Sequence, residues 1–403
     1  MLTMVHLNVA LLRGGILRID RKFHTGMQLY RKHLAVPLLS IHPELTSGDE
    51  SLIMDAVDVP EEELGYRVMT VRCAATGLPS VEELPRLRAA ISESQLLYGG
   101  GLGTLRMCAQ SRVPYVSVLE HDLRTMIACR TAEIHGRLRS ALRGAKTAYH
   151  YLTDVIPSMR RAALLHCNGY PIYRESAWFN RNRLLYLDSR MSEAALISET
   201  ELRQRLRARH ARPLRMLFSG RLELIKGTLD LVRVAAECAS RGLDFALDIY
   251  GNGSLRGAMD RLIADRGLSG RVKIHDPVPF PRLLGIAKEC DVFLCCHVQG
   301  DPSCTYLESM GCGLPIVGYS NAMWRAMQTE SRAGVATALG DPGGIAEALA
   351  GMLSTAGEID ALSLRARAFA AEHTFEKEFA RRTDSLNQLL LSLDRNSAPQ
   401  PSA

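Results

Sequence analysis

The chain has 403 residues, a length that predicts two or three folded domains. Hydrophobic residues make up 47% and charged residues 23%, as in an ordinary soluble globular enzyme. The net charge of +6 is too small to indicate a nucleic-acid-binding protein, and no apolar run approaches the ~20 residues that a membrane-spanning helix needs.

The first residues, MLTMVHLNVALL, lack the basic region and the small-residue cleavage site of a signal peptide. They predict a first strand instead. The ten cysteines include no CxxC pair, and the cluster of Cys295, Cys296, Cys304 and Cys312 sits in or beside an apolar segment, which favours buried thiols in a reducing compartment. A cytoplasmic protein is therefore expected.

The first half alternates apolar runs with helical patterns, which predicts a parallel sheet with helices on both faces. Strands are expected at 5–12, 36–42, 94–99 and 113–122, and helices at 27–33 and 104–110.

The second half repeats this plan more clearly. Strands are expected at 214–220, 245–253, 271–278, 291–298 and 314–319, and helices at 228–240, 254–266, 280–290 and 305–313. The predicted fold class is α/β, with two doubly wound Rossmann-like domains facing a central cleft. In such sheets, ligands bind outside the carboxyl ends of the strands.

The predicted domain organisation follows these patterns. An N-terminal domain is expected at 1–197, a polar linker at 198–213 and a C-terminal domain at 214–373. A terminal helix is expected at 374–392, followed by a disordered tail at 393–403.

The segment GRLELIKG follows the predicted strand 214–220 and leads into a helix. Arg221 offers a planar fork of donors and Lys226 a mobile point charge, both suited to a diphosphate. Gly220 and Gly227 permit close backbone approach, and the helix beginning near Thr228 adds free N–H groups. The alternative is an ordinary basic surface loop.

The segment GDPSCTYLESMGCGLP places a short polar loop before a helix. Backbone N–H groups at such a position bind phosphate or sugar oxygens. Glu308, about one turn into the helix, is suited to accept hydrogen bonds from a ribose diol. The alternatives are helix caps at Asp301 and Ser303 and dipole compensation at Glu308. The candidate donor-binding residues of this loop are Ser303, Cys304, Thr305, Tyr306 and Glu308.

A third strand-end turn, YGNGSL, contains Gly251 and Asn252. It is interpreted either as part of the nucleotide site or as a tight turn without a ligand.

Taken together, GRLELIKG, DIYGNGSL, RVKIHDPV, CDVFLCC and YLESMGCGLPIVGY resemble the retaining glycosyltransferases of family four (group 1), which have the GT-B fold. The resemblance covers about 214–353. It implies a nucleoside diphosphate sugar as donor, with Arg221 and Lys226 on the diphosphate and Glu308 on the ribose.

The resemblance also reaches the N-terminal half, where it implies a catalytic position for His121 after the strand in VPYVSVLEHDL. Gly15 corresponds to a glycine-rich loop after the first strand. One residue departs from the pattern, because family members carry a Glu eight positions before the ribose Glu and this chain has Gly300 there. Asp301 is the nearest carboxylate and is the candidate replacement.

The implied reaction is glycosyl transfer with retention at the anomeric carbon. Arg221 and Lys226 would stabilise the charge that develops on the leaving diphosphate, with no metal or other cofactor. UDP-, GDP- and ADP-sugars remain open as donors. The alternatives are a nucleotide-sugar epimerase of the same fold and a catalytically silent sugar-nucleotide-binding protein.

Residues 124–190 carry 12 Lys and Arg against 4 Asp and Glu, and so hold the whole positive excess of the chain. Such a stretch is suited to an anionic membrane surface or an anionic substrate, and otherwise forms a solvated basic face. The acceptor is expected to be a sugar, a lipid-linked glycan or another molecule. A peripheral location on the inner face of the membrane is the corresponding hypothesis.

Overall fold

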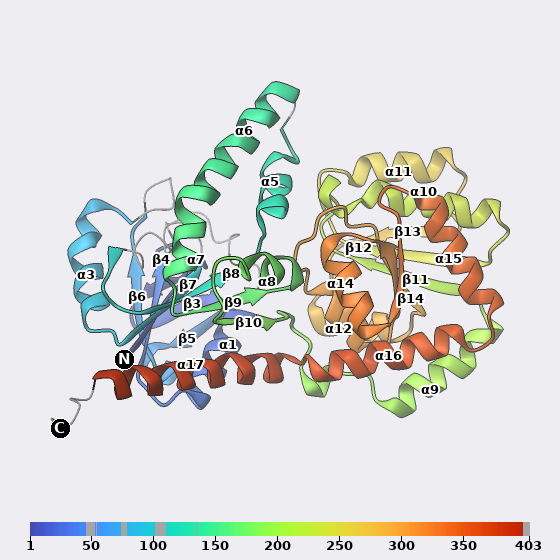
Figure 1. Cartoon of the computed structure of the whole chain (residues 1–403). Coiled ribbons are helices and arrows are strands. Elements are labelled where there is room, and N and C mark those ends of the chain that lie inside the picture. The colour runs from blue at the N-terminus through green and yellow to red at the C-terminus, as the bar shows by residue number, and fades with distance from the viewer. Residues whose placement is uncertain (46–52, 54, 74–78, 101–109, 135, 398–403) are drawn as a thin grey trace.

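The computed structural model describes residues 1–45, 53, 55–73, 79–100, 110–134 and 136–397. It contains two large sheets, each covered by helices, which lie side by side along the molecule (Figure 1). All strand pairs within both sheets are parallel, so the predicted fold class is confirmed.

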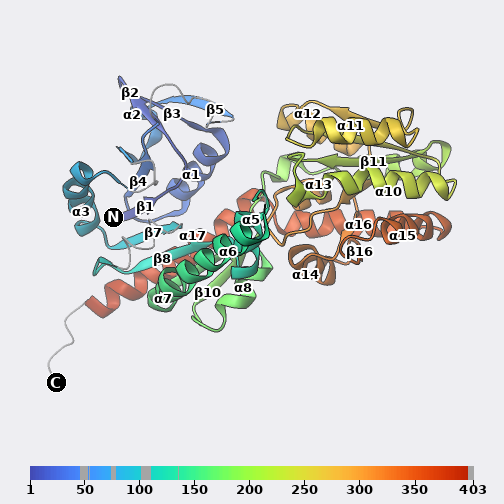
Figure 2. The ribbon, with the colours of Figure 1, turned by 90° about the horizontal axis from the view of Figure 1, so that it is seen from above.

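In spatial order, the strands of the first sheet are β10 (Arg183–Tyr186), β9 (Leu164–Asn168), β8 (Tyr115–Leu119), β7 (Leu96–Gly100), β1 (Leu2–Val5), β4 (Leu38–Pro43) and β6 (Arg67–Val71). Those of the second are β13 (Val272–His275), β12 (Phe245–Tyr250), β11 (Leu214–Ser219), β14 (Val292–Cys295), β15 (Ile316–Tyr319) and β16 (Gly334–Thr337). A small antiparallel sheet, β2 (Leu11–Arg13), β3 (Ile16–Asp20) and β5 (Ala56–Pro60), lies beside the first (Figure 2).

The helices of the N-terminal part are α1 (Arg21–His33), α2 (Glu61–Leu64), η2 (Val81–Glu83), α3 (Leu84–Ser92), α5 (Leu123–Thr131), α6 (Arg137–His150), the π-helical turn η3 (Tyr151–Val155), α7 (Ile156–Arg161) and α8 (Tyr170–Ser176). Those of the C-terminal part are η4 (Glu193–Ala195), α9 (Glu199–Ala208), η5 (Arg209–Ala211), η6 (Leu224–Lys226), α10 (Thr228–Ser240), α11 (Arg256–Asp265), α12 (Phe280–Lys288), α13 (Thr305–Gly311), α14 (Ala322–Ser331), α15 (Pro342–Ser354), α16 (Glu358–Glu372) and α17 (Phe375–Ser397).

The central strands read as continuous apolar runs because helices cover both faces of each sheet. Every residue of β1, β14 and β15 is buried. The strand order reverses at β1, which lies between β4 and β7, and at β11, which lies between β12 and β14. These reversals open crevices at the carboxyl ends of the strands, where ligands of doubly wound sheets bind.

The predicted strand at 5–12 is wrong. β1 occupies Leu2–Val5, and the chain then turns into the small antiparallel sheet through the hairpin between β2 and β3. Gly14 and Gly15 form its turn with φ angles of 56° and 77°, which favour glycine. The predicted helix at 104–110 falls largely on residues outside the described part of the chain.

The C-terminal helix α17 returns to the N-terminal domain and runs along its base (Figure 1). It packs on α1 through Phe379, whose ring lies so close to Gly26 that a Cβ atom there would approach to 2.5 Å. Leu389, Leu390 and Leu393 continue the apolar face. For this reason α17 extends to Ser397. The predicted disordered tail at 393–403 is therefore wrong for residues 393–397, which are helical.

The predicted linker contains a helix. Ser198 and Glu201 form a capping box at the start of α9. Arg205 then donates to the carbonyl oxygens of Cys312 and Gly313 at 2.8 and 2.6 Å, which fixes α9 to the C-terminal domain. Within the described residues, no helix combines the length and the apolar character required to cross a bilayer.

Candidate active site in the cleft

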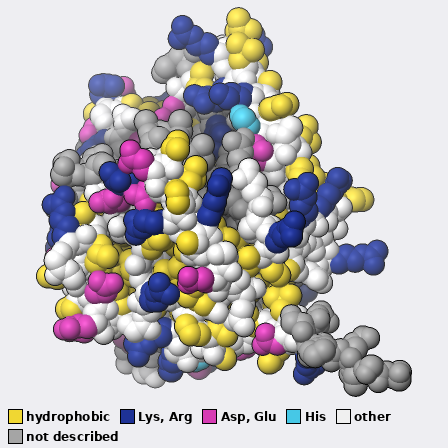
Figure 3. All heavy atoms as spheres, turned by 90° about the vertical axis from the view of Figure 1, so that its left-hand side faces the viewer, with side chains coloured by type: hydrophobic (Ala, Val, Ile, Leu, Met, Phe, Trp, Pro, Cys, Tyr) yellow, Lys and Arg dark blue, Asp and Glu magenta, His cyan; other side chains and the backbone are white. Residues whose placement is uncertain are grey.

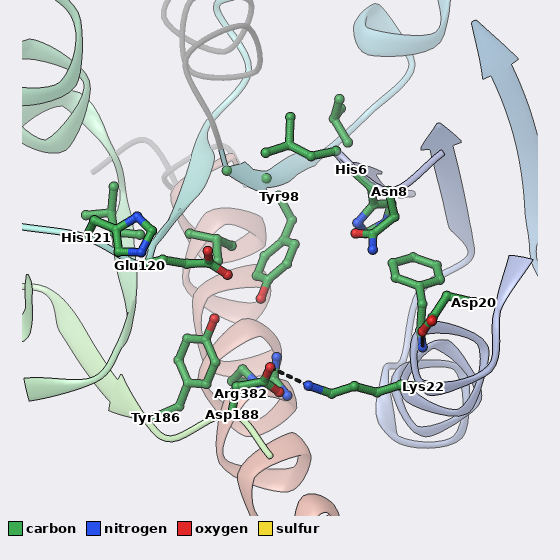
Figure 4. Close-up of a pocket in the computed structure, with 18 of the residues that line it drawn as sticks. His6, Asn8, Asp20, Lys22, Tyr98, Glu120, His121, Tyr186, Asp188 and Arg382 are labelled. Atoms are coloured by element: carbon green, nitrogen blue, oxygen red, sulfur yellow. Dashed lines mark hydrogen bonds and ion pairs between the residues drawn. The ribbon is translucent and has the colours of Figure 1, made fainter. Parts of the chain in front are cut away.

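A cavity of about 710 Å³ opens at the carboxyl edge of the first sheet (Figure 4). Its walls come from β1, α1, β7, β8, α5 and α17, and from the crossing segment, residues 187–192, which follows β10 and leads to the C-terminal domain. Polar and charged side chains from these elements face it, namely His6, Asn8, Asp20, Lys22, Tyr98, Glu120, His121, Tyr186, Asp188 and Arg382.

Lys22 of α1 reaches across the cavity to Asp188 in the crossing segment. Its Nζ atom lies 2.5 Å from Asp188 Oδ2 and 3.5 Å from the Sγ atom of Cys304, which precedes α13 in the other domain. Burial disfavours the ammonium form, but the attraction of Asp188 outweighs it, so the pKa of Lys22 is raised. Lys22 therefore remains charged and joins three separate parts of the chain.

Glu120 and His121 follow β8 and line the same cavity, so the sequence-predicted His121 lies at a strand end that faces the cleft. The carboxylate of Glu120 opens into the cavity, yet the surrounding protein raises its pKa. Burial is the largest cause, and Asp188 adds to it, while His121 and Lys22 oppose it.

The floor of the cavity is formed by Arg382 of α17 and by tyrosines. The guanidinium carbon lies 3.8 Å from the ring centroid of Phe379 and 4.5 Å from that of Tyr186. The hydroxyls of Tyr30 and Tyr98 lie 2.9 Å apart beside it. This part of the cavity thus combines a buried cation with hydrogen-bonding hydroxyls.

Across the cleft, the loop of Gly220 to Gly227 follows β11. The turn η6 buries Lys226, whose side chain is 8% exposed, whereas Arg221 is exposed. Gly227 has a φ of 59°, and a Cβ atom there would lie 2.0 Å from the carbonyl oxygen of Cys296, so only glycine fits. Close contact with the end of β14 fixes the loop.

The turn after β12 supports this loop. The amide of Leu222 donates to the carbonyl oxygen of Asn252 at 2.9 Å, and that of Gly220 donates to Tyr250 at 3.0 Å. A Cβ atom at Gly251 would lie 1.9 Å from the oxygen of Gly220. The structure therefore brings the predicted residues Gly220, Gly251 and Asn252 together by direct backbone contact.

Lys226 donates to Asp301 Oδ2 at 2.8 Å. Burial opposes ionisation of Asp301, but Lys226 and His297 outweigh it and lower the pKa of the carboxyl. His297 is buried behind the pair, and burial together with Lys226 lowers its pKa to about 3. Asp301, the candidate sugar-binding carboxylate, thus forms an ion pair with Lys226, the candidate diphosphate cation.

Gly300 lies between the two domains. A Cβ atom there would lie 3.1 Å from Cβ of Ala322 at the start of α14 and 3.4 Å from Oγ1 of Thr125 on α5. Next to it, the thiol of Cys129 donates to Oε1 of Gln299 at 2.9 Å. Members of the family that this chain resembles carry a Glu at the position of Gly300. In this chain, close packing between α5 and the C-terminal domain leaves little room for a side chain at that position.

Glu308 is buried, with 5% of its side chain exposed, and both of its oxygens accept hydrogen bonds from Arg190 at 2.8 and 3.2 Å. The guanidinium carbon of Arg190 also lies 4.1 Å from the ring centroid of Phe280. Like Asp188, Arg190 belongs to the crossing segment. The segment thus binds Lys22 of one domain and Glu308 of the other.

The predicted loop residues have different environments. The hydroxyls of Ser303 and Thr305 lie 2.9 Å apart, and Cys304 faces Lys22. The amides of Ser303 and Tyr306 already donate to Asp301 and Ser303. Tyr306 is fully buried, and its hydroxyl accepts from Asn321 at 3.1 Å. The side chain of Tyr306 therefore belongs to the core and does not reach a sugar nucleotide bound at this loop.

Gly15 is also separate from this site, since it is exposed in the β2–β3 hairpin and is absent from the cavity wall. Four charged residues that stand in none of the predicted motifs also belong to the candidate site: Lys22, Asp188, Arg190 and Arg382. They lie in helices or in the crossing segment rather than in a glycine-rich motif, so no local pattern marked them.

Residues 213–355 match the sequence family described as Glycosyl transferases group 1. A D-inositol 3-phosphate glycosyltransferase of Arthrobacter sp. (strain FB24) is 35% identical over 106 residues, which cover 25% of each chain. A D-inositol 3-phosphate glycosyltransferase 1 of Catenulispora acidiphila is 28% identical over 170 residues, 39% of each chain. The matched segment thus spans from about a quarter to two fifths of the length of these relatives.

Solved structures match over nearly the whole chain. Anabaena Alr3699/HepE in complex with UDP has a TM-score of 0.63 at 14% identity and covers 98% of this chain and 99% of its own. Sucrose-phosphate synthase of Thermosynechococcus elongatus has a TM-score of 0.69 at 13% identity, covering 97% and 99%. The chain therefore has the two-domain GT-B fold, and its C-terminal domain matches the group 1 glycosyl transferases.

Proposed function

We propose that the protein is a glycosyltransferase that moves a sugar from a nucleoside diphosphate sugar to an acceptor, with retention at the anomeric carbon. The observation that carries this proposal is the buried Lys226 at the end of a glycine-bounded loop within the matched segment. HepE, which shares the fold, has been solved with UDP and with UDP-glucose, which supports a donor of this class.

On the donor side, Lys226 would leave Asp301 for the diphosphate, and exposed Arg221 would close on it from the solvent side. A diphosphate carries more negative charge than one carboxylate, so it competes effectively for the ammonium. Both cations would stabilise the charge that develops as the nucleotide leaves, which is the part that a metal takes in other enzymes.

On the acceptor side, the cavity offers carboxylates, hydroxyls and cations to a hydroxyl-rich molecule. Glu120 and His121 line this cavity at the end of β8. His121 would face the anomeric carbon, and the acceptor hydroxyl would attack from the side on which the diphosphate departs. The departing phosphate would take the proton of that hydroxyl, so no protein nucleophile is required. Closure of the cleft would exclude water from this step.

The acceptor in this proposal is a sugar or a lipid-linked glycan. Residues 124–190, which hold the positive excess of the chain, would bring the enzyme to an anionic membrane surface from the cytoplasmic side.

The test is a thermal-shift measurement with UDP, GDP and ADP, followed by turnover of the corresponding sugar nucleotides. We expect one nucleotide to stabilise the protein and Lys226→Met to reduce transfer by about 10²–10³-fold. Lys273→Met, an exposed lysine on β13, is the matched control and should keep full activity.

Other outcomes would decide against the proposal. An isomerised sugar formed from the donor alone would indicate an epimerase. Nucleotide binding without transfer to any sugar or lipid-linked acceptor would indicate a binding protein.

A further inference from the structure

Helix α6 projects from the N-terminal domain beyond α5, and with α5 forms its outermost part in Figure 1. It packs on α5 through small residues, since a Cβ atom at Gly144 would lie 3.6 Å from Ile127 and 3.9 Å from Thr131. Thr147 is buried on the same face. The face that contacts the protein thus has no large apolar side chain along α6 itself.

The large apolar side chains of α6 itself point to solvent instead. Leu138 is 74% exposed, Leu142 62%, Tyr149 64% and Leu152, in the turn η3, 57%. Ala145 is exposed between them. These residues follow the i, i+4, i+7, i+11, i+14 spacing, so they form one continuous stripe along about four turns.

A row of cations runs beside this stripe. Arg139, Arg143 and Lys146 are exposed and are also spaced at i, i+4 and i+7, each about 100° around the helix from a stripe residue. Arg137 stands on the other flank, and the sequence RLRSALRGAKTAYH has no carboxylate. Figure 3 shows hydrophobic and Lys or Arg side chains together at the top of the molecule, where α6 begins.

We infer that the exposed face of α6 is a docking surface for an anionic lipid bilayer, with Leu138, Leu142, Tyr149 and Leu152 in the acyl boundary and the cations on the headgroups. An amphipathic helix lies in the membrane interface in this way, and long cationic side chains reach the headgroups from its flanks. A second copy of the chain fits the stripe poorly, because pairing two helices of this kind would bring like charges together.

The position of α6 connects this surface to the cavity. α6 packs along α5, and α5 contributes Met126, Cys129 and Arg130 to the cavity wall. A bilayer under α6 would thus lie one helix away from the proposed acceptor site. In this respect the inference rests on the proposed function and specifies which surface presents a membrane-bound acceptor.

The test is co-sedimentation of the full chain with vesicles of pure phosphatidylcholine and with vesicles of equal parts phosphatidylcholine and phosphatidylglycerol. We expect binding to the anionic vesicles only, weakened by salt. Replacing Arg139, Arg143 and Lys146 by Gln should weaken it about a hundredfold, since each cation contributes about fivefold near such a surface. The double variant Leu138→Ser/Leu142→Ser should weaken it at least as much, because it removes the inserted side chains.

The matched control replaces three exposed cations of the C-terminal domain, Arg261, Arg266 and Lys273, by Gln. Binding of this control equal to that of the triple α6 variant would show a general charge effect and overturn the inference, as would equal binding of the wild type to both kinds of vesicle. A dimer that the Leu138→Ser/Leu142→Ser variant dissociates in the absence of lipid would also overturn it, in favour of self-association.

Nucleotide binding without vesicles should be unchanged in all these variants, so failure of the docking surface and failure of the proposed sugar transfer remain distinguishable.

Discussion

Arg190 holds Glu308 by two hydrogen bonds, of 2.8 and 3.2 Å, across the boundary between the crossing segment and the C-terminal domain. The carboxylate is the candidate ribose ligand, and each of its oxygens retains a lone pair for a hydroxyl group. Asp188, two residues earlier, accepts one hydrogen bond from Lys22 of the N-terminal domain. The segment that joins the domains therefore places one ion pair on each side of the cleft.

Arg190→Ala should weaken nucleoside diphosphate binding by about tenfold, since charged hydrogen bonds contribute about 1.5–3 kcal/mol and this pair is partly exposed. The reason is that Glu308 loses the partner that fixes its orientation. A nucleotide lacking both ribose hydroxyls, measured by calorimetry, should bind the variant and the wild type alike. Arg203→Ala, in an exposed pair with Glu199, is the control. Equal losses for both nucleotides would reduce Arg190 to a structural role.

Asp301→Asn should separate the two interpretations of this carboxylate. If Asp301 only neutralises Lys226, its removal frees the ammonium, and the free nucleoside diphosphate should bind several-fold more tightly. We expect this result from the 2.8 Å pair. A loss of affinity confined to the sugar nucleotide, with the diphosphate unaffected, would instead assign Asp301 to the donor sugar.

The second domain was largely predictable because its chemistry lies in continuous motifs. GRLELIKG contains Gly227, which packs against Cys296, and Lys226, which precedes it in the sequence. The strands of this domain also alternate regularly with helices. A pattern of this kind needs only local spacing to be recognised. The sequence also indicated, through Gly300, that the sugar-binding loop departs from the family it resembles.

The cavity was not predictable in the same way. Lys22, Asp188 and Arg382 are separated by more than 160 residues along the chain and meet because α17 returns to the first domain. Tyr306 was predicted to offer its backbone N–H to the donor sugar, but this amide donates to the carbonyl oxygen of Ser303 and the ring stacks on Trp324 in the core. Sequence spacing does not report which face of a short helix is covered, so both facts required the structure.

Gly300→Ala should lower the stability of the protein by about 1–3 kcal/mol, as overpacking does, because the new Cβ atom would crowd Ala322 and Thr125. Gly300→Glu should lower the stability further. It should not tighten binding of the sugar-nucleotide donor, even though it restores the carboxylate of the family pattern. Urea unfolding measures the first effect. Gly351→Ala, in α15 with open space around it, should instead stabilise by roughly 0.5–1 kcal/mol. Unchanged stability of Gly300→Ala would mean that the domains separate freely at α5.

His166 should make the stability of the protein depend on pH. Its ring nitrogens lie 2.8 Å from Ser385 Oγ on α17 and 3.3 Å from the hydroxyl of Tyr98. Burial, assisted by Arg382, lowers its pKa to about 3, against 6.5 in the unfolded chain. Between these values the unfolded state binds the proton and the folded state does not. Stability must therefore fall as the pH is lowered through this window, by about 1.4 kcal/mol per pH unit for each such proton.

His166→Gln should reduce the change of the unfolding free energy with pH by the contribution of one proton. The buried His42 and His297, with pKa values of about 4 and about 3, still contribute to this slope in the variant. The measurement is the free energy of unfolding in urea at several pH values between 7 and 4. The loss of the Ser385 contact lowers the stability of the variant at every pH, so the slope rather than the stability at neutral pH is the informative quantity. A slope equal to that of the wild type would show that His166 takes up a proton while α17 remains docked.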